Sequence, residues 1–232
     1  MQLVINNFTK SYGDNLVLDN INFSFEQGKI YGLLGRNGSG KTTLFNCLDD
    51  LIRYDQGEVY LLHDDGTKEE LDDTNVGLVL TDPRIPEFLT GYEFIKSFME
   101  ITKIDELDKI DEYFNIIDLD EEARHKLIRD YSMGMKNKIQ ILMFLILKPK
   151  ILLLDEPLTS FDVIVSAEIK EILKDLRDNH IIIFSTHILE LATTLCDEIV
   201  VINNKKLEQV DSSIIHTSDF EDRIVEILKN EE

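Results

Sequence analysis

The stretch GRNGSGKT, residues 35–42, decides the fold. It matches the phosphate-binding pattern G-x-x-x-x-G-K-[ST] and directly follows the strand-like run Ile30–Leu34. In such a loop the glycines let backbone N–H groups point inward at an anion. Lys41 adds a positive charge at the β and γ phosphates, and Thr42 offers a magnesium ligand. A chance glycine turn is the alternative, but the motif and its strand context agree and predict a nucleotide site.

Two apolar runs further along predict the centre of a sheet. Ile151–Leu154 and Ile181–Phe184 are short and continuous, and the helical pattern of Val163–Leu176 separates them. Short, continuous apolar runs are typical of strands that are buried on both faces of a parallel sheet, since neither face needs polar residues. We therefore expect an α/β protein with a mainly parallel core sheet flanked by helices.

Polar side chains follow both runs. Asp155 and Glu156 end the first, where two carboxylates are costly unless a cation or a proton transfer uses them. Asp155 is predicted to hold magnesium directly or through water, and Glu156 to accept a proton from the water that attacks the γ phosphate. His187 follows the second run, at the end of the strand where ligands gather. Helix capping by the two acids, and a structural role for the histidine, are the alternatives.

The other segments predict two further regions. Residues 2–33 read as short strands separated by turns, which indicates an antiparallel β region. From Phe88 to Leu127 apolar residues recur at intervals of three and four, which predicts an inserted helical lobe over about residues 88–130. An amphipathic helix is expected from Phe220 to Leu228. We expect one domain over residues 1–232.

Composition excludes several classes of protein. The chain has 24 basic and 45 acidic residues, a formal net charge of -21, and lacks the clustered Lys and Arg that bind a phosphate backbone, so no nucleic-acid partner is expected. No stretch approaches the ~18 apolar residues that cross a bilayer.

The beginning of the chain does not resemble a secretory signal. Cys47 and Cys196 lie far apart in the sequence, which suits a reducing cytosol, and both are expected to pack as small apolar residues.

The order of the motifs resembles one family. After GRNGSGKT come YSMGM at 131–135, LLLDEP at 152–157, SFD at 160–162 and then His187. Over essentially its whole length the chain resembles the ATP-binding subunit of an ABC transporter. The resemblance implies a P-loop ATPase of ABC type with an antiparallel β subdomain and an inserted α-helical subdomain. It further implies ATP and Mg²⁺ as cofactors, a homodimer or heterodimer of ATPase subunits, and a membrane-spanning permease on a separate chain. The protein would then be cytoplasmic, peripheral on the inner face of the cell membrane.

The resemblance also assigns site residues. Catalysis would depend on Glu156, His187 and Lys41, and magnesium on Thr42 and Asp155. The expected nucleotide-binding residues are Tyr12, Gly35, Asn37, Gly38, Ser39, Gly40, Lys41, Thr42, Thr43, Ser132, Gly134 and Asp162.

Five of these positions have specific expected roles. Tyr12 would stack on adenine, the alternative being a half-buried strand aromatic. Ser132 and Gly134 match the signature usually written LSGGQ, which contacts the γ phosphate held by the opposite subunit, and Asp162 would couple the two sites. Ser132 is also a good N-cap for the helix that follows, and simple capping is the alternative there. His187 would contact the γ phosphate as the switch histidine.

Two departures from the family pattern stand out. Thr81, followed by Asp82, occupies the place of a glutamine that normally touches magnesium and senses the membrane partner. Either residue could coordinate a water or the metal, or coupling could be altered here. Met133 and Met135 replace the first glycine and the glutamine of the signature. The form S-x-G-M-x-x-K looks like that of bacterial exporters of drugs and bacteriocins, which favours export.

Three functions compete at this point. The first is the ATPase subunit of a transporter. A soluble ABC-type ATPase in translation or DNA maintenance is the alternative, but relatives of that kind carry two tandem domains with a basic linker or a long coiled coil, and this chain shows neither. A regulatory module that binds ATP without turnover is the third, and intact Lys41, Asp155, Glu156 and His187 oppose it.

Overall fold

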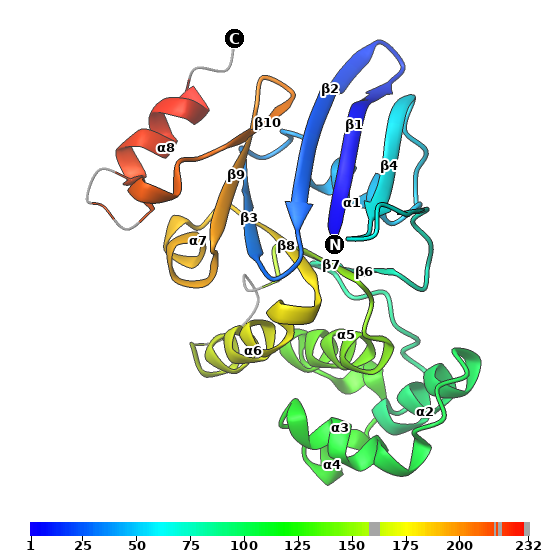
Figure 1. The fold of residues 1–232 in the computed structure, drawn as a ribbon. Coiled ribbons are helices and arrows are strands. Elements are labelled where there is room, and N and C mark those ends of the chain that lie inside the picture. Colours follow the sequence, from blue (N-terminus) through cyan, green and yellow to red (C-terminus); the bar gives the residue numbers. More distant parts are fainter. Residues whose placement is uncertain (158–162, 216, 218–219, 230–232) are drawn as a thin grey trace.

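Two β-sheets organise the protein in the computed structural model, which describes residues 1–157, 163–215, 217 and 220–229 (Figure 1). One sheet has four strands in the order β2-β1-β4-β5, all antiparallel. The other has six strands in the order β10-β9-β3-β8-β7-β6 and is parallel except for its final hairpin. The mainly parallel core sheet and the antiparallel sheet are both as expected.

The antiparallel sheet is built on the first two strands. Its members are β1 (Gln2–Tyr12), β2 (Asn15–Glu26), β4 (Gln56–Leu62) and β5 (Lys68–Glu69). Glycine at position 13 has φ of 60°, in the left-handed region that the tight turn between β1 and β2 uses. Leu18, Ile21 and Phe25 of β2 are buried, and a register shift against β1 between Leu18 and Ile21 interrupts the strict alternation.

The core sheet contains the apolar runs that the sequence singles out. Its strands are β3 (Ile30–Leu34), β6 (Val76–Val79), β7 (Ile151–Asp155), β8 (Ile181–Thr186), β9 (Glu198–Asn203) and β10 (Lys206–Gln209). Every residue of β3, β7 and β8 is buried, which explains why these strands are apolar up to the polar residues that end β7 and β8.

The structure corrects one sequence-based assignment. Residues 30–33 were expected in the antiparallel region together with residues 2–26, but β3 pairs in parallel with β8 and β9. The physical reason is that both faces of this five-residue strand are buried, which suits the centre of a parallel sheet. The four-residue strand β6 was not predicted, because its sequence VGLV is too short to show a period.

Helices cover both faces of the core sheet. They are α1 (Lys41–Leu48), α2 (Gly91–Ile101), α3 (Ile110–Ile116), α4 (Glu121–Arg124), α5 (Met133–Leu147), α6 (Val163–Leu176), α7 (Leu189–Leu195) and α8 (Phe220–Lys229). Short 3-10 turns occupy Leu107–Lys109, Ile128–Asp130, Arg177–Asn179 and Ser212–Ile214. Within the described ranges, no helix has both the length and the apolar character to cross a membrane.

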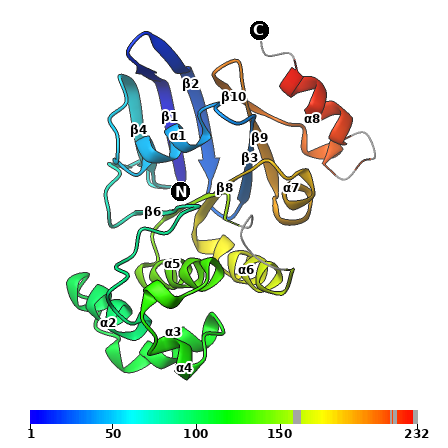
Figure 2. The ribbon, with the colours of Figure 1, turned by 180° about the vertical axis from the view of Figure 1, so that it is seen from behind.

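Three groups of buried side chains stabilise these layers. In the first, Leu44 and Phe45 of α1 pack between the two sheets, against Phe8 of the antiparallel sheet and Leu153 of the core sheet. The second lies on the opposite face of the core sheet, under α5, α6, α7 and α8. The third joins α2 and α3 to α5, and these helices lie together at one end of the molecule (Figures 1 and 2).

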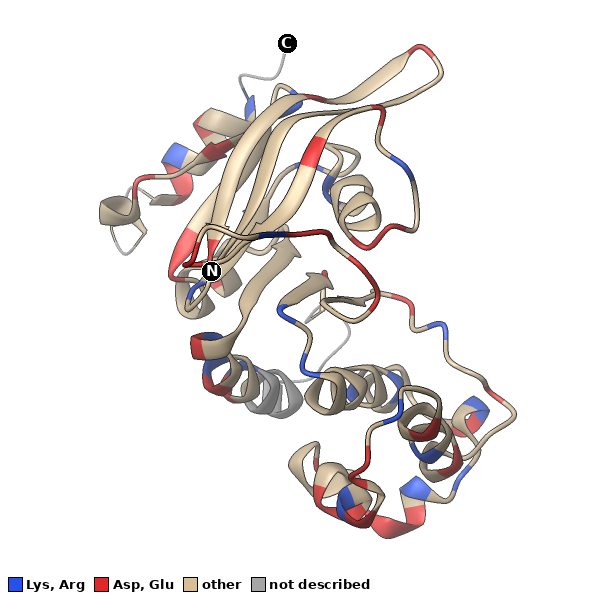
Figure 3. Ribbon diagram, turned by 45° about the vertical axis from the view of Figure 1, so that its right-hand side comes forward, with Lys and Arg blue, Asp and Glu red and all other residues tan. Residues whose placement is uncertain are grey.

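The helical end of the molecule begins with a well-defined cap. Thr90 Oγ1 accepts a hydrogen bond from the backbone N–H of Glu93, and the Glu93 carboxylate accepts one from the backbone N–H of Thr90. This reciprocal capping box fixes the start of α2. Cys47 and Cys196 are free and buried, as expected of small apolar residues. Charged residues lie mainly on loops, helices and strand ends (Figure 3).

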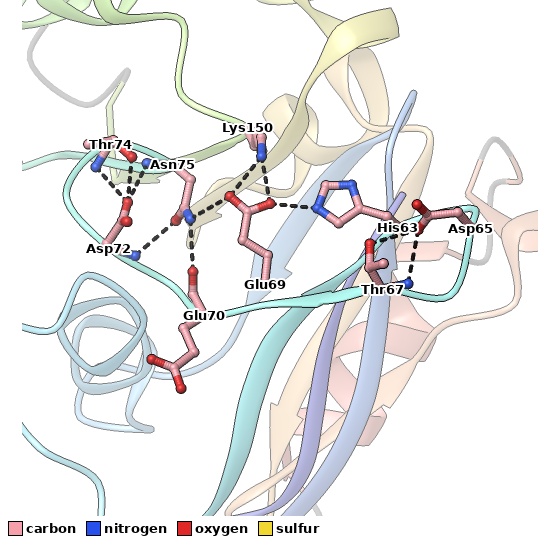
Figure 4. Close-up of polar contacts among 9 residues, drawn as sticks. All are labelled: His63, Asp65, Thr67, Glu69, Glu70, Asp72, Thr74, Asn75 and Lys150. Carbon is pink, nitrogen blue, oxygen red and sulfur yellow. Dashed lines mark hydrogen bonds and ion pairs between the residues drawn. The ribbon is translucent and has the colours of Figure 1, made fainter.

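A polar cluster joins the antiparallel sheet to the start of β7. Glu69 of β5 accepts hydrogen bonds from Lys150 Nζ at 2.6 and 2.7 Å and from Asn75 Nδ2 at 3.2 Å. His63 Nε2 lies 2.5 Å from the same carboxylate (Figure 4). The bonds from Lys150, together with those from His63 and Asn75, lower the pKa of Glu69 to about 2. This cluster ties the short β4–β5 hairpin to the core sheet.

Candidate nucleotide site

The loop of residues 35–42 connects β3 to α1, and its backbone requires the glycines of the motif. Gly38 and Gly40 have φ of 83° and 108°, which are disfavoured for residues with a side chain. A Cβ atom at Gly35 would lie 2.4 Å from Ser39 Oγ, so the hydroxyl would have to move to admit one. The loop therefore curls tightly at the carboxyl end of β3, directly before the N-terminus of α1.

The side chain of Lys41 bonds to the backbone of the loop that precedes it. Its Nζ donates hydrogen bonds to the carbonyl oxygens of Gly35 at 2.8 Å and Arg36 at 3.2 Å. The residue is only 6% exposed. Burial lowers the pKa of Lys41, while the charges of Glu156 and Asp155 act in the opposite direction. The ammonium group is thus held beside the loop, where it can stabilise phosphate oxygens.

Thr42 and Asp155 lie together beside the loop. Thr42 Oγ1 donates a hydrogen bond of 2.8 Å to Asp155 Oδ2, and Ser185 Oγ donates one of 2.6 Å to Asp155 Oδ1. Mg²⁺ prefers oxygen ligands and commonly takes only one or two from the protein, with waters and substrate phosphates completing the shell. The donor set fits Mg²⁺.

The predicted base and the predicted switch histidine are neighbours. Glu156 follows β7, and His187 follows the adjacent parallel strand β8. Nδ1 of His187 lies 3.2 Å from Oε1 of Glu156, within hydrogen-bond distance. Two residues that are 31 positions apart are therefore brought to the same edge of the sheet, as expected for the carboxyl ends of parallel strands.

A cavity of about 270 Å³ collects most of these groups. It is lined by Val17, Asn37, Gly38, Gly40, Lys41, Thr42, Thr43, Thr81, Asp155 and Glu156. A second hollow, of about 410 Å³, includes Gly35, Asn37 and His187 in its lining. A larger hollow of about 600 Å³ between α1 and β4 contains none of these residues. The smaller cavity therefore holds the chemistry of the phosphate loop and both carboxylates.

Comparison with known proteins decides the family. The family model described as "ABC transporter" matches residues 18–159. The bacitracin transport ATP-binding protein BcrA of Enterococcus faecalis is 35% identical over 217 residues, which cover 90% of this chain and 69% of that protein. The chain belongs to the ABC transporter ATP-binding family. It is the ATP-binding subunit of an ABC transporter, and an ATPase.

Other relatives agree. The probable sulfate/thiosulfate import ATP-binding protein CysA of Chlorella vulgaris is 32% identical over 218 residues, covering 92% of each chain. The dimeric post-hydrolysis structure of the ATP-binding cassette MJ0796, bound to ADP and Pi, superposes with a TM-score of 0.78 at 24% identity, over 90% of this chain and 98% of that chain. The cbiO1 structure from Clostridium perfringens, part of the transporter complex cbiONQ, gives 0.77 at 24% identity, over 96% and 93%. These structures show the same fold.

The hairpin of β1 and β2 packs on the phosphate loop of this ABC cassette through β2. Tyr12 ends β1 and is 50% exposed, with Lys10 Nζ 4.9 Å from the centre of its ring. Side-chain atoms of Val17 and Leu18 would lie 3.0 Å from a Cβ atom at Gly40, so β2 packs directly on the loop. The Tyr12 ring is thus exposed at the end of β1, in the hairpin whose second strand packs on the loop.

The signature residues lie at the start of α5, away from the two cavities beside the loop. Ser132 is the N-cap, and its Oγ accepts a hydrogen bond of 3.2 Å from the backbone N–H of Met135. The expected capping role is therefore present. Gly134 is within the first turn, and the neighbouring Met133 is 42% exposed. Asp162 lies outside the described residues.

Two hydroxyl side chains bond to Asp155 in ways that the sequence analysis did not predict. Thr81 Oγ1 donates a hydrogen bond of 2.7 Å to the backbone oxygen of Asp155. Ser185 is fully buried at the end of β8 and bonds the Asp155 carboxylate. The sequence could have pointed to both residues, because each is a hydroxyl residue directly after an apolar run, VGLVL for Thr81 and IIIF for Ser185.

Proposed function

We propose that this chain binds ATP with Mg²⁺ beside the loop of residues 35–42, hydrolyses it, and thereby powers export through a separate membrane-spanning permease. The observation that carries the proposal is the convergence of two distant motifs on one cavity. Lys41 and Thr42 come from the loop, and Asp155 and Glu156 from the end of β7. Phosphoryl transfer needs charge neutralisation and positioning, and these groups supply both.

Each residue of the cavity has a proposed part. The backbone N–H groups of the loop and Lys41 bind the β and γ phosphates. Thr42 and Asp155 hold Mg²⁺, which when bound neutralises charge on the phosphate oxygens. Glu156 orients the attacking water and accepts its proton, because its carboxylate lines the cavity. His187 contacts the γ phosphate and, at 3.2 Å from Glu156, orients that carboxylate.

Two copies of the chain, or this chain and a similar one, are proposed to close around two ATP molecules. Ser132 and Gly134 of one copy would contact the nucleotide of the other through the N-terminus of α5. This assignment is supported by the exposure of Ser132 and Met133, which leaves the start of α5 accessible. Tyr12 is proposed to stack on adenine, and Asp162 to couple the two sites.

The permease is proposed to dock on the helical end of the molecule and so to keep the ATPase at the inner face of the cell membrane. Phe88 and Ile101 are 78% and 79% exposed there, so this end of the molecule offers apolar side chains to a partner. Residues 88–130 are proposed as the helical lobe of a single domain over residues 1–232, supported by the separate packing of α2 and α3 against α5. Export rests on the form S-x-G-M-x-x-K at residues 132–138, because relatives named for bacitracin transport and for sulfate import do not distinguish direction.

Co-purification tests the transporter function. Tagged Glu156→Gln chain is purified from detergent-solubilised membranes of its native host with Mg²⁺ and ATP, and retained proteins are identified. We expect a polytopic membrane protein, and we expect less of it with a Lys41→Ala, Glu156→Gln double variant if ATP strengthens the assembly. Recovery of only ribosomal or DNA-repair proteins, with the tag shown not to block assembly, would instead indicate a soluble ABC-type ATPase.

Transport direction needs a second measurement. The ATPase and its permease are reconstituted in vesicles with the ATPase domain facing outward. Export from the cell then corresponds to ATP-dependent uptake of substrate into the vesicles. ATP-dependent release from preloaded vesicles would contradict the proposed direction.

A further inference from the structure

The peptide bond between Asp155 and Glu156 precedes an unusual backbone conformation. Glu156 has φ of 50°, in the left-handed region where the Cβ atom of an L-residue approaches the following carbonyl oxygen. Such a conformation persists at a non-glycine residue only where the surroundings hold it in place, and it is frequent at functional sites. The direction of the Glu156 side chain depends on this conformation.

Both polar groups of that peptide bond are held by side chains. The carbonyl oxygen of Asp155 accepts the 2.7 Å hydrogen bond from Thr81 Oγ1. The N–H of Glu156 donates a hydrogen bond of 3.0 Å to Ser185 Oγ. Since the C=O and N–H of a trans peptide point in opposite directions, the two hydroxyls fix the peptide plane from opposite sides.

The sheet order places these hydroxyls where they are needed. β7 lies between β6 and β8, Thr81 follows the end of β6, and Ser185 belongs to β8. Asp155 and Ser185 are register partners. A change of Thr81 or of Ser185 can therefore release one side of the peptide without touching the phosphate loop.

We infer that Thr81 and Ser185 are positioning residues that hold the Asp155–Glu156 peptide and so aim the Glu156 carboxylate at the attacking water. The inference rests on the proposed function, because it takes Glu156 as the proton acceptor. It also gives Thr81 a role at the place where the family usually carries glutamine. The hydroxyl hydrogen of Thr81 is used by the Asp155 carbonyl, so its contribution is orientation of the backbone.

Turnover and nucleotide affinity together test the inference at Thr81. Thr81→Val keeps the shape of the side chain and removes the hydroxyl, while Thr81→Ser keeps the hydroxyl. With the full chain, we expect Thr81→Val to lower kcat by about 10- to 100-fold, because small errors in the position of a reacting group are costly. The dissociation constant for ATP with Mg²⁺ should stay within about twofold, and Thr81→Ser should restore most of the rate.

A matched control removes a similar bond elsewhere. Thr102 Oγ1 donates to the carbonyl oxygen of Phe98 at 2.8 Å in α2, so Thr102→Val loses the same type of hydrogen bond away from the site. Its turnover should match the unchanged protein. Thr81→Ala, with a smaller side chain, provides a second variant with the same expected loss should Thr81→Val fold poorly.

The outcomes distinguish the positioning role of Thr81 from the proposed ATP hydrolysis on which it rests. Wild-type kcat in Thr81→Val and Thr81→Ala, while Glu156→Gln has lost hydrolysis, would overturn the positioning role alone. Weaker ATP binding in Thr81→Val with unchanged kcat would also overturn it. Wild-type turnover in Glu156→Gln would overturn the proposed function itself. If Thr81 acts through Glu156, adding Thr81→Val to Glu156→Gln should cause no further loss in single-turnover rate.

Discussion

Thr42 and Asp155 lie 113 positions apart in the sequence, yet the hydroxyl of one donates a hydrogen bond of 2.8 Å to the carboxylate of the other. The bond joins the first turn of α1 to the end of β7. It brings two oxygen ligands suited to Mg²⁺ to the cavity that also contains Lys41 and Glu156. The metal and phosphate parts of the proposed site are thus assembled by the fold of one chain.

Asp155→Asn should weaken the magnesium dependence of ATP binding. The amide keeps the shape of the carboxylate but loses its charge, so we expect ATP affinity in the presence of Mg²⁺ to fall by at least about tenfold and affinity without Mg²⁺ to change little. Titration calorimetry with and without Mg²⁺ measures both values. Asp73→Asn, on an exposed loop, is the control and should match the unchanged protein. An equal loss with and without Mg²⁺ would contradict the assignment.

His187→Gln should slow hydrolysis while leaving ATP binding intact. The imidazole lies 3.2 Å from Glu156 and adds one proposed contact to a γ phosphate that the loop and Lys41 already bind, so we expect kcat to fall by roughly 10- to 100-fold and ATP affinity to change much less. Steady-state phosphate release and equilibrium binding provide the two readouts. His125→Gln, beside Tyr92 in the helical part, is the matched control. Unchanged turnover in His187→Gln would remove this histidine from the mechanism.

Asp49→Asn should stabilise the fold at neutral pH. Burial, followed by the nearby charge of Asp50, raises the pKa of Asp49 to about 6, and the residue caps the C-terminus of α1, where negative charge is unfavourable. A carboxyl whose folded pKa is raised contributes stability at low pH that is lost as the pH rises through the folded value. The cost therefore develops between the ordinary pKa of about 4 and about 6, and persists above it.

Urea unfolding at pH 8 and pH 5 measures this effect. We expect Asp49→Asn to raise the free energy of unfolding by about 1–2 kcal/mol at pH 8 and by less at pH 5, a value reduced for partial exposure. Asp14→Asn in the exposed turn after β1 is the control. No gain at pH 8 would show that Asp49 is not a buried charge.

Glu69→Gln should weaken the link between the antiparallel sheet and β7. The pKa of Glu69 is lowered to about 2, mainly by the bond from Lys150. A carboxyl group whose pKa is lower in the folded than in the unfolded protein stabilises the fold at pH values above its unfolded pKa of about 4.5. That contribution is lost as the pH falls towards 2. Because the pair is partly exposed, we expect a loss of only about 1 kcal/mol at neutral pH.

The control for that change is a more exposed ion pair on the same hairpin. Lys68 and Glu58 are 3.8 Å apart, with 57% and 71% exposed side chains, so Glu58→Gln should change the free energy of unfolding by no more than a few tenths of a kcal/mol. Urea unfolding at pH 7.5 compares the two variants. Equal effects would show that the Glu69 cluster adds no special stability.

The sequence predicts those parts of the site whose role follows from one short, continuous motif. GRNGSGKT specifies its own backbone, and ILLLDEP contains both a buried strand and the carboxylates at its end. Thr81 and Ser185 differ, because their roles depend on which strands flank β7 and on the register that pairs Ser185 with Asp155. Strand β3 was misassigned for the same reason, since an apolar run does not reveal its partners.

Single-turnover phosphate release from bound ATP tests the central claim most directly. Unchanged protein and the Glu156→Gln variant are mixed with ATP and Mg²⁺, and bound nucleotide and released phosphate are measured together. We predict equal ATP binding, with phosphate released by the unchanged protein and a loss of at least about 100-fold in rate for Glu156→Gln. Release at the same rate from both proteins would contradict the proposed role of Glu156 and the site built around it.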